Sequence, residues 1–265
     1  HGRDKVCDFS LGNPDVEPPA SFQRALEAVV RVGVPHKHGY MPNAGYPEVR
    51  EKVAARASAE QGVALGAGHI IMSCGAGGAL NSALKAILNP GDEVIASTPC
   101  FMEYGFYADN HGGKLVLAPS GPGFDLDVAA IEARITPRTA AIIVTSPNNP
   151  TGRIYPEPTL RALSDMLLRA SRRTGRTIYI LSDEPYRKLA YDNTPVPGIL
   201  GLYPHSIVAT SHSKDLSLPG ERIGYIAVNP AADDGARLVD GIILCTRILG
   251  YVNAPALMQR LVGKL

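Results

Sequence analysis

Short apolar runs rich in β-branched residues recur along the chain and predict seven β-strands. They cover residues 69–73, 93–97, 114–118, 140–145, 177–182, 206–211 and 223–228. Between several of these runs apolar residues repeat every three or four positions, as in the segment 160–170, which indicates helices that bury one face. Strands that alternate with helices are typical of a mostly parallel sheet covered on both sides. The expected fold class is therefore α/β, with a seven-stranded sheet in a three-layer α/β/α domain.

Turn residues and helix signals divide the rest of the chain. The segments 89–92, 120–123 and 173–175 carry the Asn, Pro and Gly typical of turns. A proline in the first turn predicts a helix from Pro47 to about Gln61, and another helix is expected to begin near Ala79. Residues 232–265 predict two helices separated near residues 253–255. Residues 1–40, rich in Pro and Gly, are expected to form an irregular N-terminal arm.

Composition narrows the classes of function. The 265 residues are 45% hydrophobic and 19% charged, with a formal net charge of +1, and so provide neither a basic stripe for nucleic acid nor an apolar run long enough for a membrane. Four cysteines without a Cys-x-x-Cys pair suit a reducing compartment. We therefore expect a cytoplasmic protein with no nucleic-acid or membrane partner. Both ends of the sequence suggest that one or both termini are truncated.

Polar or glycine-rich segments follow five of the predicted strands. In a parallel sheet such segments meet beyond the carboxyl ends of the strands, where ligands bind. The five segments are 73–78, 98–101, 146–152, 183–186 and 212–214. They predict one crevice lined from five strand ends.

Two of these segments carry the features of an anion site. Glycines at the start of a helix let backbone N–H groups approach a negative charge. Lys214 follows an apolar strand, and Ser211, Ser213 and Arg222 lie close to it in sequence, so these residues could clamp a phosphate whose attached ring reaches the lysine amine. A dinucleotide fingerprint is not complete, because Leu80 occupies its third glycine position.

Each feature also has a simpler interpretation when it is taken alone. The glycine segment and residues 148–152 are compatible with ordinary turns, Lys214 with a surface charge and Asp183 with a helix cap. Phe101 is compatible with a core position. The histidines at 36 and 38 have the spacing of metal ligands, but no third histidine or carboxylate pattern lies nearby, so surface histidines are favoured and no metal site is predicted.

Taken together, the motifs closely resemble class I/II aminotransferases of pyridoxal phosphate (PLP) fold type I. The resemblance rests on the order and spacing of several segments and covers nearly the whole chain. These segments are 11–15, 40–45, 89–94, 146–152, 182–186, 211–214 and 221–225. It implies a PLP-dependent enzyme that moves the amino group of an L-amino acid to a 2-oxo acid by a ping-pong mechanism.

The resemblance also implies a role for each matching residue. Lys214 would carry the cofactor as a Schiff base and act as general base, and Asp183 would pair with the pyridine nitrogen. The remaining cofactor-binding residues are expected to act as follows: Tyr186 and Asn149 on the phenolic oxygen, Phe101 on the ring face, the backbone of Gly75, Ala76 and Gly77 with Ser211, Ser213 and Arg222 around the phosphate, and Tyr40 on the phosphate of a neighbouring subunit.

This assignment predicts a homodimer with shared active sites. Residues 1–40 would form the N-terminal arm and first helix, 41–250 the PLP-binding large domain, and 251–265 the start of a linker helix towards a small C-terminal domain that is largely absent. Family members carry there an arginine for the substrate α-carboxylate, and no residue of this chain is assigned that role. Arg247 is compatible with binding a substrate side-chain carboxylate across the dimer, or with a surface position.

Three other functions remain open from the sequence. The same cofactor supports β-elimination at a carbon–sulfur bond, since it stabilises the same carbanion. A PLP-binding protein without catalysis is the second, either as a truncated, inactive relative or as a sensor module of the kind fused to transcription regulators. The sensor module would need a DNA-binding domain that this sequence does not show. A nicotinamide dehydrogenase is disfavoured by the incomplete glycine pattern. The sequence does not indicate which amino acid or keto acid is used.

Overall fold

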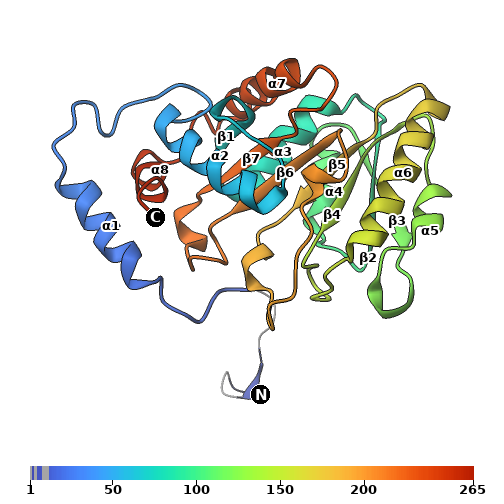
Figure 1. Ribbon diagram of the computed structural model, residues 1–265, viewed down its shortest axis with the longest axis horizontal. Coiled ribbons are helices and arrows are strands. Elements are labelled where there is room, and N and C mark those ends of the chain that lie inside the picture. Colours follow the sequence, from blue (N-terminus) through green and yellow to red (C-terminus); the bar gives the residue numbers. More distant parts are fainter. Residues whose placement is uncertain (1, 3–4, 8–11) are drawn as a thin grey trace.

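The computed structural model describes residues 2, 5–7 and 12–265, and its centre is a seven-stranded sheet between two layers of helices (Figure 1). The strand order is β1-β7-β6-β5-β4-β2-β3, and β7 alone runs antiparallel to its neighbours. The strands are β1 Ile70–Ser73, β2 Glu93–Thr98, β3 Lys114–Pro119, β4 Thr139–Thr145, β5 Tyr179–Asp183, β6 Ser206–Ser211 and β7 Gly224–Val228. The α/β fold and all seven predicted strands are confirmed.

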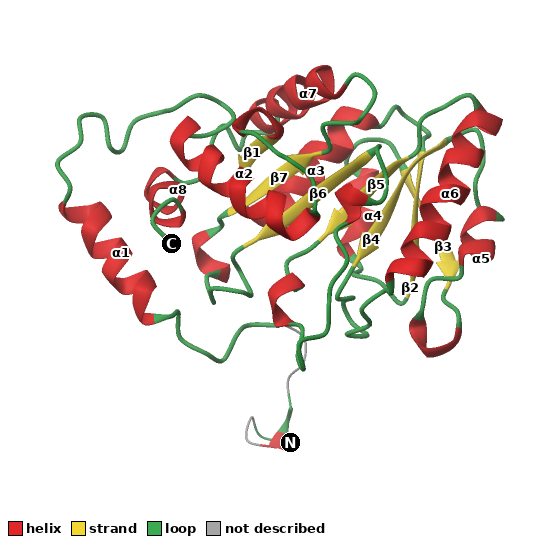
Figure 2. Ribbon diagram, in the orientation of Figure 1, coloured by secondary structure: helices red, strands yellow, loops and turns green. Residues whose placement is uncertain are grey.

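Helices cover both faces of the sheet, as Figure 2 shows. The α-helices are α1 Ala20–Arg31, α2 Pro47–Gln61, α3 Gly75–Ile87, α4 Glu103–Asp109, α5 Val128–Glu132, α6 Glu157–Thr174, α7 Gly235–Ile248 and α8 Ala256–Val262. Short 3₁₀ turns are η2 Ala67–His69, η3 Pro122–Phe124, η4 Arg187–Leu189, η5 Ile199–Gly201 and η6 Pro219–Glu221. None of the helices in the described part of the chain combines the length and apolar character that crossing a bilayer requires.

Alternating side chains of the strands divide the core into two clusters. On β4, Ile142 and Val144 pack in the cluster with α2, α6 and α8, whereas Ala141 and Ile143 face the cluster with α3, α4 and α7. All seven residues of this strand are buried, as expected for an inner strand with helices on both sides. The apolar spacing of α6 buries its predicted stripe against the first of these faces.

Two expectations about helices need correction. The helix after β1 begins at Gly75, not near Ala79, because the glycine segment itself forms the first helical turn. Composition suggests an irregular N-terminal arm, but residues Ala20–Arg31 form α1, the first helix that the resemblance implies in this segment. It buries Ala25 and Val29 and packs against α8. The predicted helix from Pro47 to Gln61 and the pair of C-terminal helices are confirmed.

Candidate active site

The sheet topology brings the predicted segments to one edge. Strands β1, β2, β4, β5 and β6 are parallel, so the segments that follow them lie beyond the same edge of the sheet. Strand β7 is antiparallel, and its amino end therefore lies at this edge too. Gly224 pairs with Ser73 on one side and with Ser211 on the other. This register explains how Arg222, which is far from Gly75 in sequence, comes to lie beside it.

Asp183, the last residue of β5, is a buried carboxylate with one oxygen that has no partner among the described residues. Its side chain is only 6% exposed. Oδ2 accepts a hydrogen bond of 2.6 Å from the Tyr104 hydroxyl, whereas Oδ1 has no hydrogen-bond partner within the described chain. Burial raises the pKa of Asp183 to about 7, against the opposing effect of the Tyr104 hydrogen bond. Such a group favours a cationic or proton-donating ligand.

Tyr104 is a member of this site that the sequence analysis missed. It is almost fully buried on α4, and its hydroxyl also lies 2.6 Å from Thr145 Oγ1 at the end of β4. A tyrosine hydroxyl has one proton, so donation to Asp183 requires Thr145 to donate to Tyr104. The sequence signal, a tyrosine three residues after Phe101 on a short helix, is also typical of a core residue.

Phe101, Tyr186 and Asn149 lie on the segments that follow β2, β5 and β4, and are linked to Tyr104, Asp183 and one another. Phe101 contacts Tyr104 edge to face, with ring centroids 5.6 Å apart, and is half-buried. Burial, followed by the charge of Asp183, raises the pKa of Tyr186, while hydrogen bonding with Asn149 acts in the opposite direction. The end of β4 and the end of β5 therefore place their predicted residues together.

The start of α3 forms a cradle for an anion. Gly75 has φ +70°, and a Cβ there would lie 2.9 Å from Arg222 Nη2, so only glycine lets the guanidinium approach the backbone this closely. The first helical turn has N–H groups without intrahelical partners. Ser211 and Ser213 are buried, and their hydroxyl oxygens lie 3.1 Å apart. These residues provide N–H, guanidinium and hydroxyl donors.

Lys214 lies in the turn after β6, half-buried. Its ammonium group donates a hydrogen bond to the backbone carbonyl of Gly12. Burial lowers the pKa of Lys214, which favours the neutral, nucleophilic amine. The arm motif at 11–15 thus reaches the site through Gly12, while Leu11, its first residue, lies outside the described residues.

Two further candidates are exposed to solvent. Tyr40 is 89% exposed in the loop between α1 and α2. Arg247 on α7 donates to Asn43 Oδ1 over 3.3 Å in an exposed contact. Among the described contacts, neither side chain bonds to the buried residues of the site.

The donor set fits pyridoxal phosphate. The unpartnered Oδ1 of Asp183 suits a protonated ring nitrogen, and the cradle at Gly75 suits a phosphate. Lys214 supplies an amine of lowered pKa for the aldehyde carbon. Each group lies at the same edge of the sheet, so the residues present meet the chemical requirements of this cofactor.

Comparison with known proteins agrees with this geometry. The family model "Aminotransferase class I and II" matches residues 4–263. A curated relative, "Probable aspartate/prephenate aminotransferase" of Thermus aquaticus, is 38% identical over 227 residues, which are 84% of this chain and 56% of the relative. The chain therefore spans little more than half the length of this relative.

Solved structures show the same likeness. An amino transferase from Eubacterium rectale superposes with a TM-score of 0.96 at 37% identity, covering 99% of this chain and 67% of that one. The aspartate aminotransferase of Thermus thermophilus with maleate gives a TM-score of 0.85 at 29% identity, covering 96% of this chain and 63% of that one. The sheet, the arrangement of strand-end residues and these matches together show that this chain belongs to the class I and II aminotransferase family.

Proposed function

We propose that the protein transfers the amino group of an L-amino acid to a 2-oxo acid, with Lys214 as the residue that binds the cofactor covalently. Pyridoxal 5'-phosphate is the cofactor of this family. The observation that carries the proposal is the buried Asp183 carboxylate, whose Oδ1 has no partner among the described residues, at the same sheet edge as Lys214 and the Gly75 cradle.

The chain's own groups would hold the cofactor at both ends. Asp183 Oδ1 accepts the hydrogen bond of the ring nitrogen and keeps it protonated. The N–H groups of Gly75, Ala76 and Gly77 bind the phosphate with Arg222, Ser211 and Ser213. A guanidinium can bind a phosphate through two parallel hydrogen bonds, which lysine cannot.

Three side chains would act on the ring itself. Tyr186 and Asn149 donate hydrogen bonds to the phenolic oxygen, and Phe101 packs on the ring face. Held in this way, pyridoxal phosphate acts as an electron sink when a proton leaves the substrate's α-carbon.

Lys214 would do the proton transfer. Its pKa is lowered by burial, so a larger fraction of the amine is neutral at a given pH and can accept a proton from the substrate α-carbon. The Gly12 carbonyl orients the amine in the described structure. The Lys214 ammonium would then give this proton to the cofactor's aldehyde carbon, and hydrolysis would release the first 2-oxo acid with its amino group left on the cofactor. A second 2-oxo acid would take up the amino group by the reverse steps.

The substrates and the assembly are part of the proposal. Relatives named aspartate/prephenate aminotransferase support an amino acid and a 2-oxo acid as substrates. Tyr40 is exposed on a loop, as a residue that completes the phosphate site of a second subunit would be. We therefore propose a homodimer with shared active sites, in which residues 41–250 form the PLP-binding domain.

A spectroscopic half-reaction tests the proposal. Purified protein mixed with PLP is expected to develop a visible absorbance band, and single amino acids are added to find one that removes it with release of the matching 2-oxo acid. Borohydride reduction followed by peptide mapping should place the cofactor on Lys214. The Lys214→Ala variant should form no reducible adduct, while a surface control, Lys114→Ala, behaves as wild type.

Two results contradict the proposal in different ways. An adduct retained by Lys214→Ala would show that the lysine is misassigned. Release of pyruvate and a thiol from L-cysteine conjugates, without formation of the pyridoxamine form, would show that the protein is a lyase and not an aminotransferase.

A further inference from the structure

A buried pair of side chains brackets Lys214. His212 and Asp215 lie on either side of it in the turn after β6, and His212 Nδ1 is 3.1 Å from Asp215 Oδ2. Each side chain is only 9% exposed. An ionised carboxylate only accepts hydrogen bonds, so His212 donates its Nδ1 proton across the turn. The pair fixes the ends of the short segment that carries the lysine.

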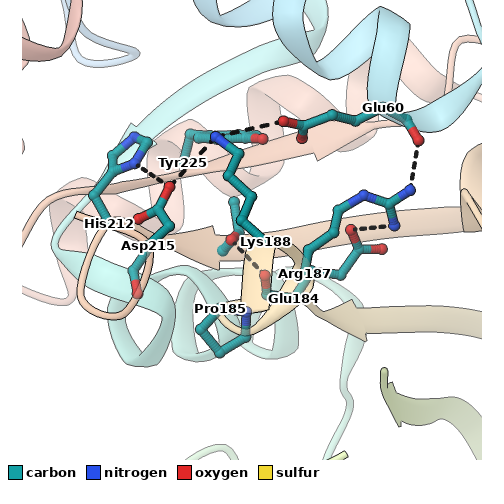
Figure 3. Close-up of a pocket in the computed structure, with 10 residues that line it drawn as sticks. Glu60, Glu184, Pro185, Arg187, Lys188, His212, Asp215 and Tyr225 are labelled. Carbon is teal, nitrogen blue, oxygen red and sulfur yellow. Dashed lines mark hydrogen bonds and ion pairs between the residues drawn. The ribbon is translucent and has the colours of Figure 1, made fainter. Parts of the chain in front are cut away.

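A second contact ties this turn to the segment that follows Asp183. Lys188 Nζ lies 3.4 Å from Asp215 Oδ2 and 3.5 Å from Glu60 Oε1 at the end of α2. Figure 3 shows Lys188 pointing between the two carboxylates. Burial alone would raise the pKa of Asp215, but His212 and Lys188 together hold it below its ordinary value. Asp215 is therefore a stable anion that links the two strand-end segments.

The backbone segment that carries Lys188 is anchored by contacts of its neighbours. Glu184, which directly follows Asp183, accepts a hydrogen bond of 2.8 Å from Gln61 and pairs with Arg187 at 3.3 Å. Arg187 also donates to the carbonyl oxygen of Glu60. The segment after β5 is thus anchored to the end of α2, so Lys188 gives Asp215 a fixed point of attachment.

A small cavity borders these side chains. A cavity of about 20 Å³ lies among them, lined by Glu184, Lys188, His212, Asp215 and Tyr225 with their neighbours (Figure 3). A space of this size admits about one water molecule. The polar contacts therefore join the turn to its neighbours beside a small polar cavity.

We infer that His212, Asp215 and Lys188 are positioning residues that set where the Lys214 amine lies relative to Asp183 and Tyr186. We call these three residues the lysine bracket. Neither the family match nor the relatives assign them a role. The inference rests on the proposed function, in which Lys214 binds the cofactor. Among the described contacts, Lys188 reaches the turn that carries Lys214 through Asp215. The two residues therefore act in series, so substitution of either one breaks the same link.

Cofactor binding by matched variants tests the bracket. The variants are Asp215→Asn, Lys188→Met and the double substitution, and Asp92→Asn is the control, because Asp92 belongs to a similarly buried pair with Arg176 at the opposite end of the strands. Three quantities are measured: the Kd for PLP, the visible circular dichroism per bound cofactor and the melting temperature of the apoprotein.

We expect each bracket substitution to weaken PLP binding by about tenfold and to change the visible circular dichroism, as misplacement of a reacting group does. The double variant should bind no more weakly than Asp215→Asn, because the residues act in series. Asp92→Asn should lower the melting temperature and leave both cofactor signals unchanged. Lys188 is half exposed, so its variant carries the test even if Asp215→Asn does not fold.

The opposite outcomes separate the two proposals. Borohydride labelling of a lysine other than Lys214 in the wild-type protein would overturn the proposed function and the bracket with it. Labelling of Lys214, together with a wild-type Kd and circular dichroism in Lys188→Met, would overturn the bracket alone. Multiplying effects in the double variant would overturn the series arrangement.

Discussion

Replacing Asp183 by asparagine removes a buried carboxyl group whose ionisation the fold opposes. Burial raises the pKa of this group from its ordinary value of 3.8 to about 7. A carboxyl with a raised folded-state pKa stabilises the fold fully below its unfolded pKa, and this contribution is lost as the pH rises through the folded pKa. The contribution of Asp183 to the stability of the apoprotein should therefore be lost between pH 4 and pH 7.

The size of the effect follows from the two pKa values. At 1.36 kcal/mol per unit, a change from 3.8 to about 7 amounts to about 4 kcal/mol. Asparagine has nearly the same shape, still accepts the Tyr104 hydrogen bond and does not ionise. The free energy of unfolding of Asp183→Asn relative to wild type should therefore rise by about 4 kcal/mol between pH 4 and pH 8.

Urea unfolding of both apoproteins, followed by circular dichroism across this pH range, measures the difference. Other titrating groups contribute alike to both proteins and cancel. Carbon-13 NMR of the Asp183 carboxyl should give a midpoint near 7 in the same apoprotein. A difference that changes by less than about 1 kcal/mol, or a midpoint near 4, would refute the account of this site. Excess PLP should stabilise wild type more than Asp183→Asn at pH 8, because only the carboxylate pairs with a protonated ring nitrogen.

Three further substitutions have defined outcomes. Tyr104→Phe removes the hydrogen bond to the Asp183 carboxylate and should raise the pKa of Asp183 by roughly one unit or more in the same NMR titration. An unchanged titration midpoint would contradict this prediction. Gly75→Ala should weaken PLP binding by about tenfold or more in an absorbance titration, because a Cβ there displaces the Arg222 guanidinium. The control Gly62→Ala, also at positive φ but in open space, should lower stability alone. Equal Kd values for PLP in the two variants would argue against a phosphate site at Gly75. Gly224→Ala places a Cβ against a backbone carbonyl oxygen of β6 and should lower the melting temperature by about 10 °C. An unchanged melting temperature would show that β6 and β7 move apart easily.

Local patterns in the sequence were sufficient to predict the elements of the fold. Short apolar, β-branched runs and a proline in a first helical turn depend only on near neighbours, so they predict the seven strands and α2. The break near residues 253–255 likewise predicts two separate C-terminal helices. Helix starts were less well predicted. An isolated glycine segment favours a turn, so the sequence predicts a helix start near Ala79. In the structure the segment from Gly75 lies against Arg222 and forms the first turn of α3.

The sequence by itself determined which residues stand at the strand ends, since alternation of strands and helices puts the segments with Lys214, Asp183 and Asn149 at one edge of a parallel sheet. Only the tertiary structure decided what surrounds them. The contact of Tyr104 with Asp183 and that of Lys188 with Asp215 join segments from different elements, and no local spacing encodes such pairs. Burial decided the protonation behaviour of Asp183, because its raised pKa depends on the helices and strands that exclude water from it.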